Sequence, residues 1–158
     1  MRCGIIALAA ALPLAAAGCG GSDGGTTTPV ACLEGPESYL EALRNAPQEA
    51  LVGGETPIAD CLPAEQEAGK IADVGAALVA ASTDLNRRAR REPLGEATVE
   101  LGYLVGTVEA RADATGGIHE DLALRVESAA LHLPKAKALP GGFQQRYEEG
   151  LAAGRKAA

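Results

Sequence analysis

Apolar residues recur at intervals of three and four along two long segments of the chain, residues 63–91 and 93–112. This spacing places the apolar side chains on one face of an α-helix. The two apolar stripes consist of Ile71, Val74, Leu78, Ala81 and Leu85, and of Leu94, Ala97, Leu101, Leu104 and Val108. Pro63 and Pro93 occupy positions where a first-turn proline is tolerated. We predict two long helices, joined as an antiparallel hairpin because Glu92-Pro93 leaves little room for a connection.

Shorter helical patterns precede and follow this pair. After the Gly116-Gly117 break, residues 118–131 predict a third main helix. Its core-facing residues are expected to be Ile118, Leu122, Val126 and Ala129. Residues 38–44 predict a short helix, residues 56–61 a short turn, and residues 143–151 a last helix. Strand patterns are almost absent, and residues 32–158 contain neither Asn-Gly nor Asp-Gly hairpin turns. The predicted fold class is therefore all-α, a small bundle with three main helices and two or three short ones.

The start of the chain has a different pattern. Arg2 supplies a positive charge, an apolar run follows, and the small residues Ala15-Ala16-Ala17-Gly18 precede Cys19. The run from Ala16 to Cys19 resembles the lipobox of bacterial lipoproteins, although Ala16 stands where that family usually has Leu. The resemblance implies that Cys19 receives a diacylglyceryl group and that the chain is cleaved just before it. Two acyl chains on one residue are sufficient for stable membrane anchoring.

Two other interpretations of this leader remain open. An ordinary secretory signal cut after Ala17 would leave a soluble protein. A membrane-spanning anchor is the third option, but the apolar run is shorter than the required ~20 residues and Pro13 interrupts it. The lipobox interpretation divides the chain into a signal peptide (1–18), a lipidated cysteine with a flexible Gly/Ser/Thr-rich tether (19–31) and a helical domain (32–158).

The four cysteines favour lipidation. Cys3 leaves with the leader and Cys19 takes the lipid, so Cys32 and Cys61 remain in an oxidising compartment where a disulfide persists. Cleavage after Ala17 would instead leave an odd thiol. The alternative is two unpaired buried cysteines, whereas a metal site lacks both a C-x-x-C pattern and a third soft ligand. We predict a Cys32–Cys61 disulfide that staples residues 32–61 to the start of the longest helix and contributes about 3.5 kcal/mol.

Charge limits the range of partners. The chain has a formal net charge of −7, and loss of Arg2 with the leader makes it one unit more negative. Nucleic acid is therefore an unfavourable partner, and so is direct adhesion of the folded body to an anionic membrane surface. We expect contact with the membrane only through the lipid on Cys19.

Three features carry candidate chemistry. The first is a cationic patch for an anion or an acidic partner, formed by Arg87, Arg88, Arg90 and Arg91. Its structural alternative is that these cations complement the negative end of the helix dipole and stay solvated. The second feature is Gly102-x-x-x-Gly106, within which Tyr103 lies. These glycines predict either close approach of a neighbouring helix or a glycine-floored groove for a ligand or a partner helix.

The third feature is the helix start at His119-Glu120. These residues could serve a small-molecule or metal site, but Leu122 and Ala123 break the H-E-x-x-H pattern. A cap with acidic first-turn residues explains the segment equally well. We expect no metal and no other cofactor, and we assign no catalytic residue.

The folded body is similar to a group of uncharacterised lipoproteins from high-GC Gram-positive bacteria. The residues that carry this similarity are 56–61, 102–106 and 115–119. The similarity brings no activity with it. We expect a non-enzymatic domain on the outer face of the cytoplasmic membrane that interacts with an envelope protein, in an oligomeric state left open. The alternatives are a small-molecule or metal-binding module near Tyr103 and His119, and a hydrolase assembled from distant residues.

Overall fold

The computed structural model describes residues 27–131 and 139–158, so Cys19 and the predicted signal peptide lie outside the described residues. Within these ranges the chain forms five α-helices, two short 3-10 helices and one two-stranded hairpin, which confirms the predicted all-α class. In chain order the elements are η1 (Val30–Leu33), α1 (Pro36–Leu43), β1 (Leu51–Val52), β2 (Thr56–Pro57), η2 (Ile58–Cys61), α2 (Ala68–Arg91), α3 (Glu96–Ala114), α4 (Glu120–Ala130) and α5 (Phe143–Ala157). None of the helices in these ranges is long and apolar enough to cross a membrane.

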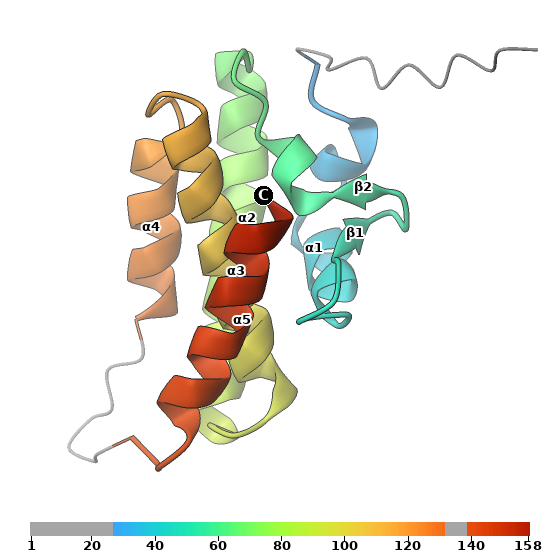
Figure 1. The fold of residues 1–158 in the computed structure, drawn as a ribbon. Coiled ribbons are helices and arrows are strands. Elements are labelled where there is room, and N and C mark those ends of the chain that lie inside the picture. Colours follow the sequence, from blue (N-terminus) through green and yellow to red (C-terminus); the bar gives the residue numbers. More distant parts are fainter. Residues whose placement is uncertain (1–26, 132–138) are drawn as a thin grey trace, which may run out of the picture.

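Helix α3 lies at the centre of the fold. It contacts α2, α4 and α5, while the short N-terminal elements lie on the opposite side of the molecule from α4 (Figure 1). Every residue of α3 from Thr98 to Val108 is buried. The sequence predicted a single apolar stripe on this helix, whereas a helix buried on all sides must be packed on every face. The additional face is the one covered by α5.

Both long helices begin later than predicted. Helix α2 starts at Ala68, and residues 62–67 precede it. In this segment the Gln66 side chain hydrogen-bonds to Thr28 and to the Cys61 carbonyl. Helix α3 starts at Glu96, after a turn in which the Gly95 amide donates to the Glu92 carbonyl at 2.9 Å. Pro63 and Pro93 are therefore not first-turn residues. Leu94, predicted to face the core, lies in this turn and is 52% exposed.

The start of α4 is also displaced from the predicted register. Ile118 was expected in the core but is 43% exposed, whereas His119 is completely buried. The turn before α4 contains Gly116 and Gly117 with φ of 66° and 88°, the left-handed region that glycine adopts most readily. This turn reverses the chain and directs His119, in place of Ile118, into the core. Ala129 is only half-buried, whereas Ala123 and Ala130 are buried.

The hairpin of β1 and β2 was not predicted. Its strands pair antiparallel, with Leu51 opposite Pro57 and Val52 opposite Thr56. The loop between them contains Gly53 and Gly54, whose φ values of 63° and 81° replace the Asn-Gly or Asp-Gly turn that residues 32–158 lack. Two-residue strands are too short to produce an alternating pattern, so the sequence contained little sign of them.

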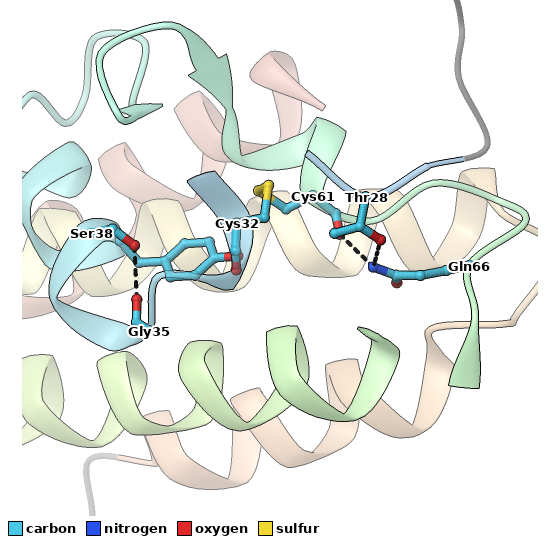
Figure 2. Close-up of a disulfide and its surroundings, with 7 residues drawn as sticks. Thr28, Cys32, Gly35, Ser38, Cys61 and Gln66 are labelled. Atoms are coloured by element: carbon cyan, nitrogen blue, oxygen red, sulfur yellow. Dashed lines mark hydrogen bonds between the residues drawn. A yellow bond between two sulfur atoms is a disulfide. The ribbon is translucent and has the colours of Figure 1, made fainter. Parts of the chain in front are cut away.

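The predicted Cys32–Cys61 disulfide is confirmed, with the two Cα atoms 5.5 Å apart (Figure 2). Both cysteines are fully buried, and the Tyr39 hydroxyl donates to the Cys32 carbonyl at 2.8 Å. The disulfide joins η1 to η2, however, and not to the start of the longest helix. The predicted tether also ends earlier than residue 31, because Thr28 is already buried and hydrogen-bonded to Gln66.

Candidate functional site

The glycines of α3 face glycines of α5. A Cβ added to Gly102 or Gly106 would overlap the carbonyl oxygen of Tyr147 or Leu151 respectively. The same holds in the opposite direction, since a Cβ on Gly150 or Gly154 would overlap backbone oxygens of α3. The two backbones are therefore in direct contact, as small-x-x-x-small pairs permit. The face proposed as an open groove for a ligand or a partner helix is covered by α5, so only the close-approach interpretation fits the structure.

Tyr103 is a structural residue of this core. It is 2% exposed, and its hydroxyl accepts a hydrogen bond from the Ala50 amide at 3.2 Å. Burial raises the pKa of Tyr103, so the hydroxyl stays protonated. This bond ties the segment before β1 to α3.

His119 lies far from Tyr103. Its hydrogen-bond partner Thr115 directly follows α3 and is twelve positions further along the chain than Tyr103, which corresponds to about 18 Å of helix at 1.5 Å per residue. Glu120 is exposed on the surface. The site predicted to combine Tyr103, His119 and Glu120 therefore does not form. In residues 27–131 and 139–158, no three His, Cys, Asp or Glu side chains gather closely enough to hold a metal ion.

His119 belongs instead to a buried hydrogen-bond network. Its Nδ1 lies 3.0 Å from the Thr115 hydroxyl and its Nε2 lies 3.0 Å from Gln66 Oε1. The Gln66 amide nitrogen donates to the Thr28 hydroxyl at 2.7 Å and to the Cys61 carbonyl at 3.0 Å (Figure 2). Burial, followed by the positive charge of Arg111, lowers the pKa of His119. Sequence reasoning missed Gln66, which it placed in the first turn of a helix.

The arginines at the end of α2 do not form a single free patch. Arg87 is paired with Asp84, and Arg90 donates to the Leu131 carbonyl at 2.9 Å. Arg88 lies 2.9 Å from Glu100 of α3, a carboxylate that is almost completely buried. Burial raises the pKa of Glu100, and the Arg88 charge opposes this effect. Glu100 gave no signal in the sequence, because its partner lies on a different helix.

Two surface hollows accompany these buried pairs. The α3–α4–α5 hollow has a volume of about 330 Å³. It is lined by Val105, Glu109, Glu127, Ala130, Leu131, Leu139, Phe143, Gln144 and Tyr147. A more polar hollow of about 410 Å³ lies beside the α2–α3 connection and is lined by charged residues that include Arg88, Glu100 and Arg146. Neither hollow is lined by Tyr103 or His119.

The α3–α4–α5 hollow combines an apolar floor with negative charge. Burial, and then the charges of Glu109 and Glu127, raise the pKa of Tyr147 to about 12. Glu109 is paired with Arg155 at 2.6 Å, and Glu127 adds a second carboxylate to the lining. Such a surface is suited to an apolar group that carries a positive charge.

The buried polar groups described above are held in structural pairs: His119 with Gln66, Glu100 with Arg88, and Tyr103 with the Ala50 amide. A search of protein-family models, of curated proteins and of solved structures finds no match to this chain.

Proposed function

We propose that the chain is a lipid-anchored domain on the extracytoplasmic face of a bacterial cytoplasmic membrane, which binds an envelope protein and is not an enzyme. The anchor is Cys19, at the end of a leader that resembles a lipobox. The domain would be held close to the membrane. Because Thr28 is already part of the fold, only eight residues separate it from Cys19.

The observation that carries the proposal is the Cys32–Cys61 disulfide. Disulfides persist in oxidising compartments and are rare in the cytosol, which supports export. With these two cysteines paired and Cys3 removed in the leader, Cys19 is the one remaining cysteine. Lipidation therefore leaves no exposed free thiol in the mature chain.

Fractionation of cells that express the Cys19→Ala variant tests the anchor. We expect the variant to leave the membrane fraction almost completely, because it has lost both acyl chains. Cys3→Ala is the matched control and should stay with the membrane, since Cys3 is discarded with the leader. Retention of Cys19→Ala in the membrane at the level of the control would refute lipid anchoring.

The α3–α4–α5 hollow is the proposed docking surface for the partner. It is lined by the exposed apolar side chains of Leu131 and Leu139, and the carboxylates of Glu109 and Glu127 lie beside them. This combination favours a protein segment that presents an apolar side chain next to a lysine or arginine. The surface replaces both the glycine groove and the Arg87–Arg91 patch as the proposed interaction site.

A photo-crosslinking residue at Leu131 tests this docking surface in membranes of the native host. Leu124 is the matched control, because it is exposed on α4, the helix that Leu131 directly follows, but does not line the hollow. We expect one discrete crosslinked product from position 131 that weakens several-fold when Glu127→Gln is added. Equal products from positions 131 and 124, or a product insensitive to Glu127→Gln, would remove the hollow as the docking site.

A further inference from the structure

The polar hollow beside the α2–α3 connection is built by three helices. Arg88 comes from α2, Glu96 and Glu100 come from α3, and Arg146 comes from α5, so we name it the α2–α3–α5 hollow. Figure 1 shows the α2–α3 connection and the start of α5 at one end of the molecule, with the segment that enters from residue 27 at the other end. Its volume of about 410 Å³ lies in the range of roughly 300–1,000 Å³ that small-molecule sites occupy. It shares no lining residue with the proposed docking surface.

The charges on the α2 side of this hollow balance one another. Arg88 lies 2.9 Å from Glu100 and 3.1 Å from Asp84, and Arg87 pairs with Asp84 as well. The two guanidinium groups and the two carboxylates therefore form one neutral network. Glu100 is 3% exposed, so the network belongs to the wall of the hollow and leaves no net charge there for a ligand.

Arg146 differs from Arg88, because no carboxylate pairs with it in the part of the chain that the structure describes. Its side chain is half-buried, and its Nε is buried without a hydrogen-bond acceptor among the described residues. A donor that is removed from water and gains no acceptor is costly. The planar guanidinium matches a carboxylate, which accepts two parallel hydrogen bonds from it. A ligand carboxylate would therefore supply what Arg146 lacks.

Two exposed carboxylates also line the hollow. Glu92 directly follows α2 and Glu96 begins α3, and neither forms an ion pair within the described ranges. A Cβ added to Gly95 would lie 3.0 Å from the Cδ of Glu92, so the Glu92 side chain lies against the turn that joins the helices. The hollow thus contains one positive charge, on Arg146, and two negative charges that the fold leaves unpaired.

Leu94 adds an apolar surface to the same hollow. Its side chain is 52% exposed, and its Cδ2 would lie 3.4 Å from a Cβ added to Gly142, the residue before α5. Leu94 therefore extends from the α2–α3 connection toward the helix that carries Arg146. An aliphatic group of a ligand that packs against this leucine removes apolar area of both from water.

These charges discriminate between classes of small ligand. Glu92 and Glu96 repel a simple anion, whereas a simple cation leaves the Arg146 guanidinium without an acceptor. We propose that the hollow binds a free α-amino acid with an aliphatic side chain. Its carboxylate pairs with Arg146, and its ammonium pairs with Glu92 and Glu96. Its side chain packs against Leu94, and binding depends neither on the protein-docking surface nor on the lipid at Cys19.

Three ligands separate these classes. 4-Methylpentanoate is L-leucine without the ammonium, and L-leucinamide lacks the carboxylate. Isothermal titration calorimetry of the full chain at about pH 6.5, where the ammonium groups stay protonated, should show 1:1 binding of L-leucine with a Kd below about 1 mM. Each of the other two should bind at least roughly tenfold more weakly, since it loses one set of charge-assisted hydrogen bonds. Equal affinity for L-leucine and 4-methylpentanoate, or for L-leucine and L-leucinamide, would overturn the proposal.

Arg146→Gln should weaken binding of L-leucine at least roughly tenfold. Arg125→Gln is the matched control, because it makes the same change at an exposed arginine of α4 that does not line the hollow. The double variant Glu92→Gln/Glu96→Gln should also bind L-leucine more weakly. It should not weaken 4-methylpentanoate, which has no ammonium.

Arg146→Lys keeps the test informative if Arg146→Gln fails to fold. Lysine retains the charge but lacks the bidentate geometry, so this variant should bind L-leucine several-fold more weakly than the parent does. An unchanged affinity in either Arg146 variant would overturn the proposal. So would a parent protein that shows no binding of L-leucine at about 1 mM.

Discussion

The N-terminal region, residues 28–67, and the α3–α5 helix pair are held together in different ways. The N-terminal region contains short elements, of which the eight-residue α1 is the longest. Its chain is held by the Cys32–Cys61 disulfide and by buried side-chain hydrogen bonds from Tyr39 and Gln66. Helices α3 and α5 are regular, and their backbones touch where four glycines face one another.

This difference follows from how each segment satisfies its backbone. The N-terminal region buries apolar side chains such as Tyr39, Leu43 and Ile58, but its short elements cannot satisfy all their backbone groups within regular secondary structure, so a covalent bond and polar side chains compensate. A long helix satisfies its own backbone and gains most from close packing, which glycine permits at the point of contact. The N-terminal region is therefore stabilised by a disulfide, and the α3–α5 pair by the close backbone packing that its glycines permit.

Loss of the disulfide should produce the largest effect on the N-terminal region. The double variant Cys32→Ala/Cys61→Ala should lower the free energy of unfolding by about 3.5 kcal/mol, because the unfolded chain regains the freedom of a closed loop. The two cysteines are 29 residues apart. Chemical denaturation of this variant measures the loss of unfolding free energy. Hydrogen exchange of the same variant should be faster in residues 28–67, with α3 and α5 still protected. A loss of less than about 1 kcal/mol would mean that packing and hydrogen bonds alone hold this region.

A smaller effect is expected at the helix pair. Gly106→Ala should cost about 2–3 kcal/mol, because its Cβ would overlap the backbone of α5 and force the helices apart. Gly69→Ala is the matched control in α2, since a Cβ there meets no described atom within 4 Å. That control should raise stability by about 0.5–1 kcal/mol through helix propensity. If the two substitutions changed the free energy of unfolding alike, close glycine contact would not be what joins α3 to α5.

The predictable part of the fold depends on local or compositional signals. The periodicity of Ile71 to Leu85 revealed α2, and the cysteine count indicated the Cys32–Cys61 pair without any knowledge of distance. The burial of α3 on all sides was not predictable in this way. Its second face is covered by α5, which follows a long connection and meets α3 through glycines, residues that add no hydrophobic signal.

The candidate site was predictable only in part, for a related reason. Gly102-x-x-x-Gly106 indicated close helix approach, but its partner was not evident from the pattern. His119 stood out as a residue, yet its burial depends on the turn at Gly116-Gly117 and on Gln66, which is 53 positions away. Arg88 was noticed for its charge, whereas its buried partner Glu100 lies on another helix. Pairs that form only in three dimensions leave little trace in one sequence.

The intact mass of the protein extracted from membranes tests the central claim most directly. The account predicts a polypeptide that begins at Cys19, carries a diacylglyceryl group on that residue, and has Cys32 and Cys61 oxidised. The same protein without lipid and beginning at Gly18, as ordinary secretion after Ala17 would produce, would contradict it.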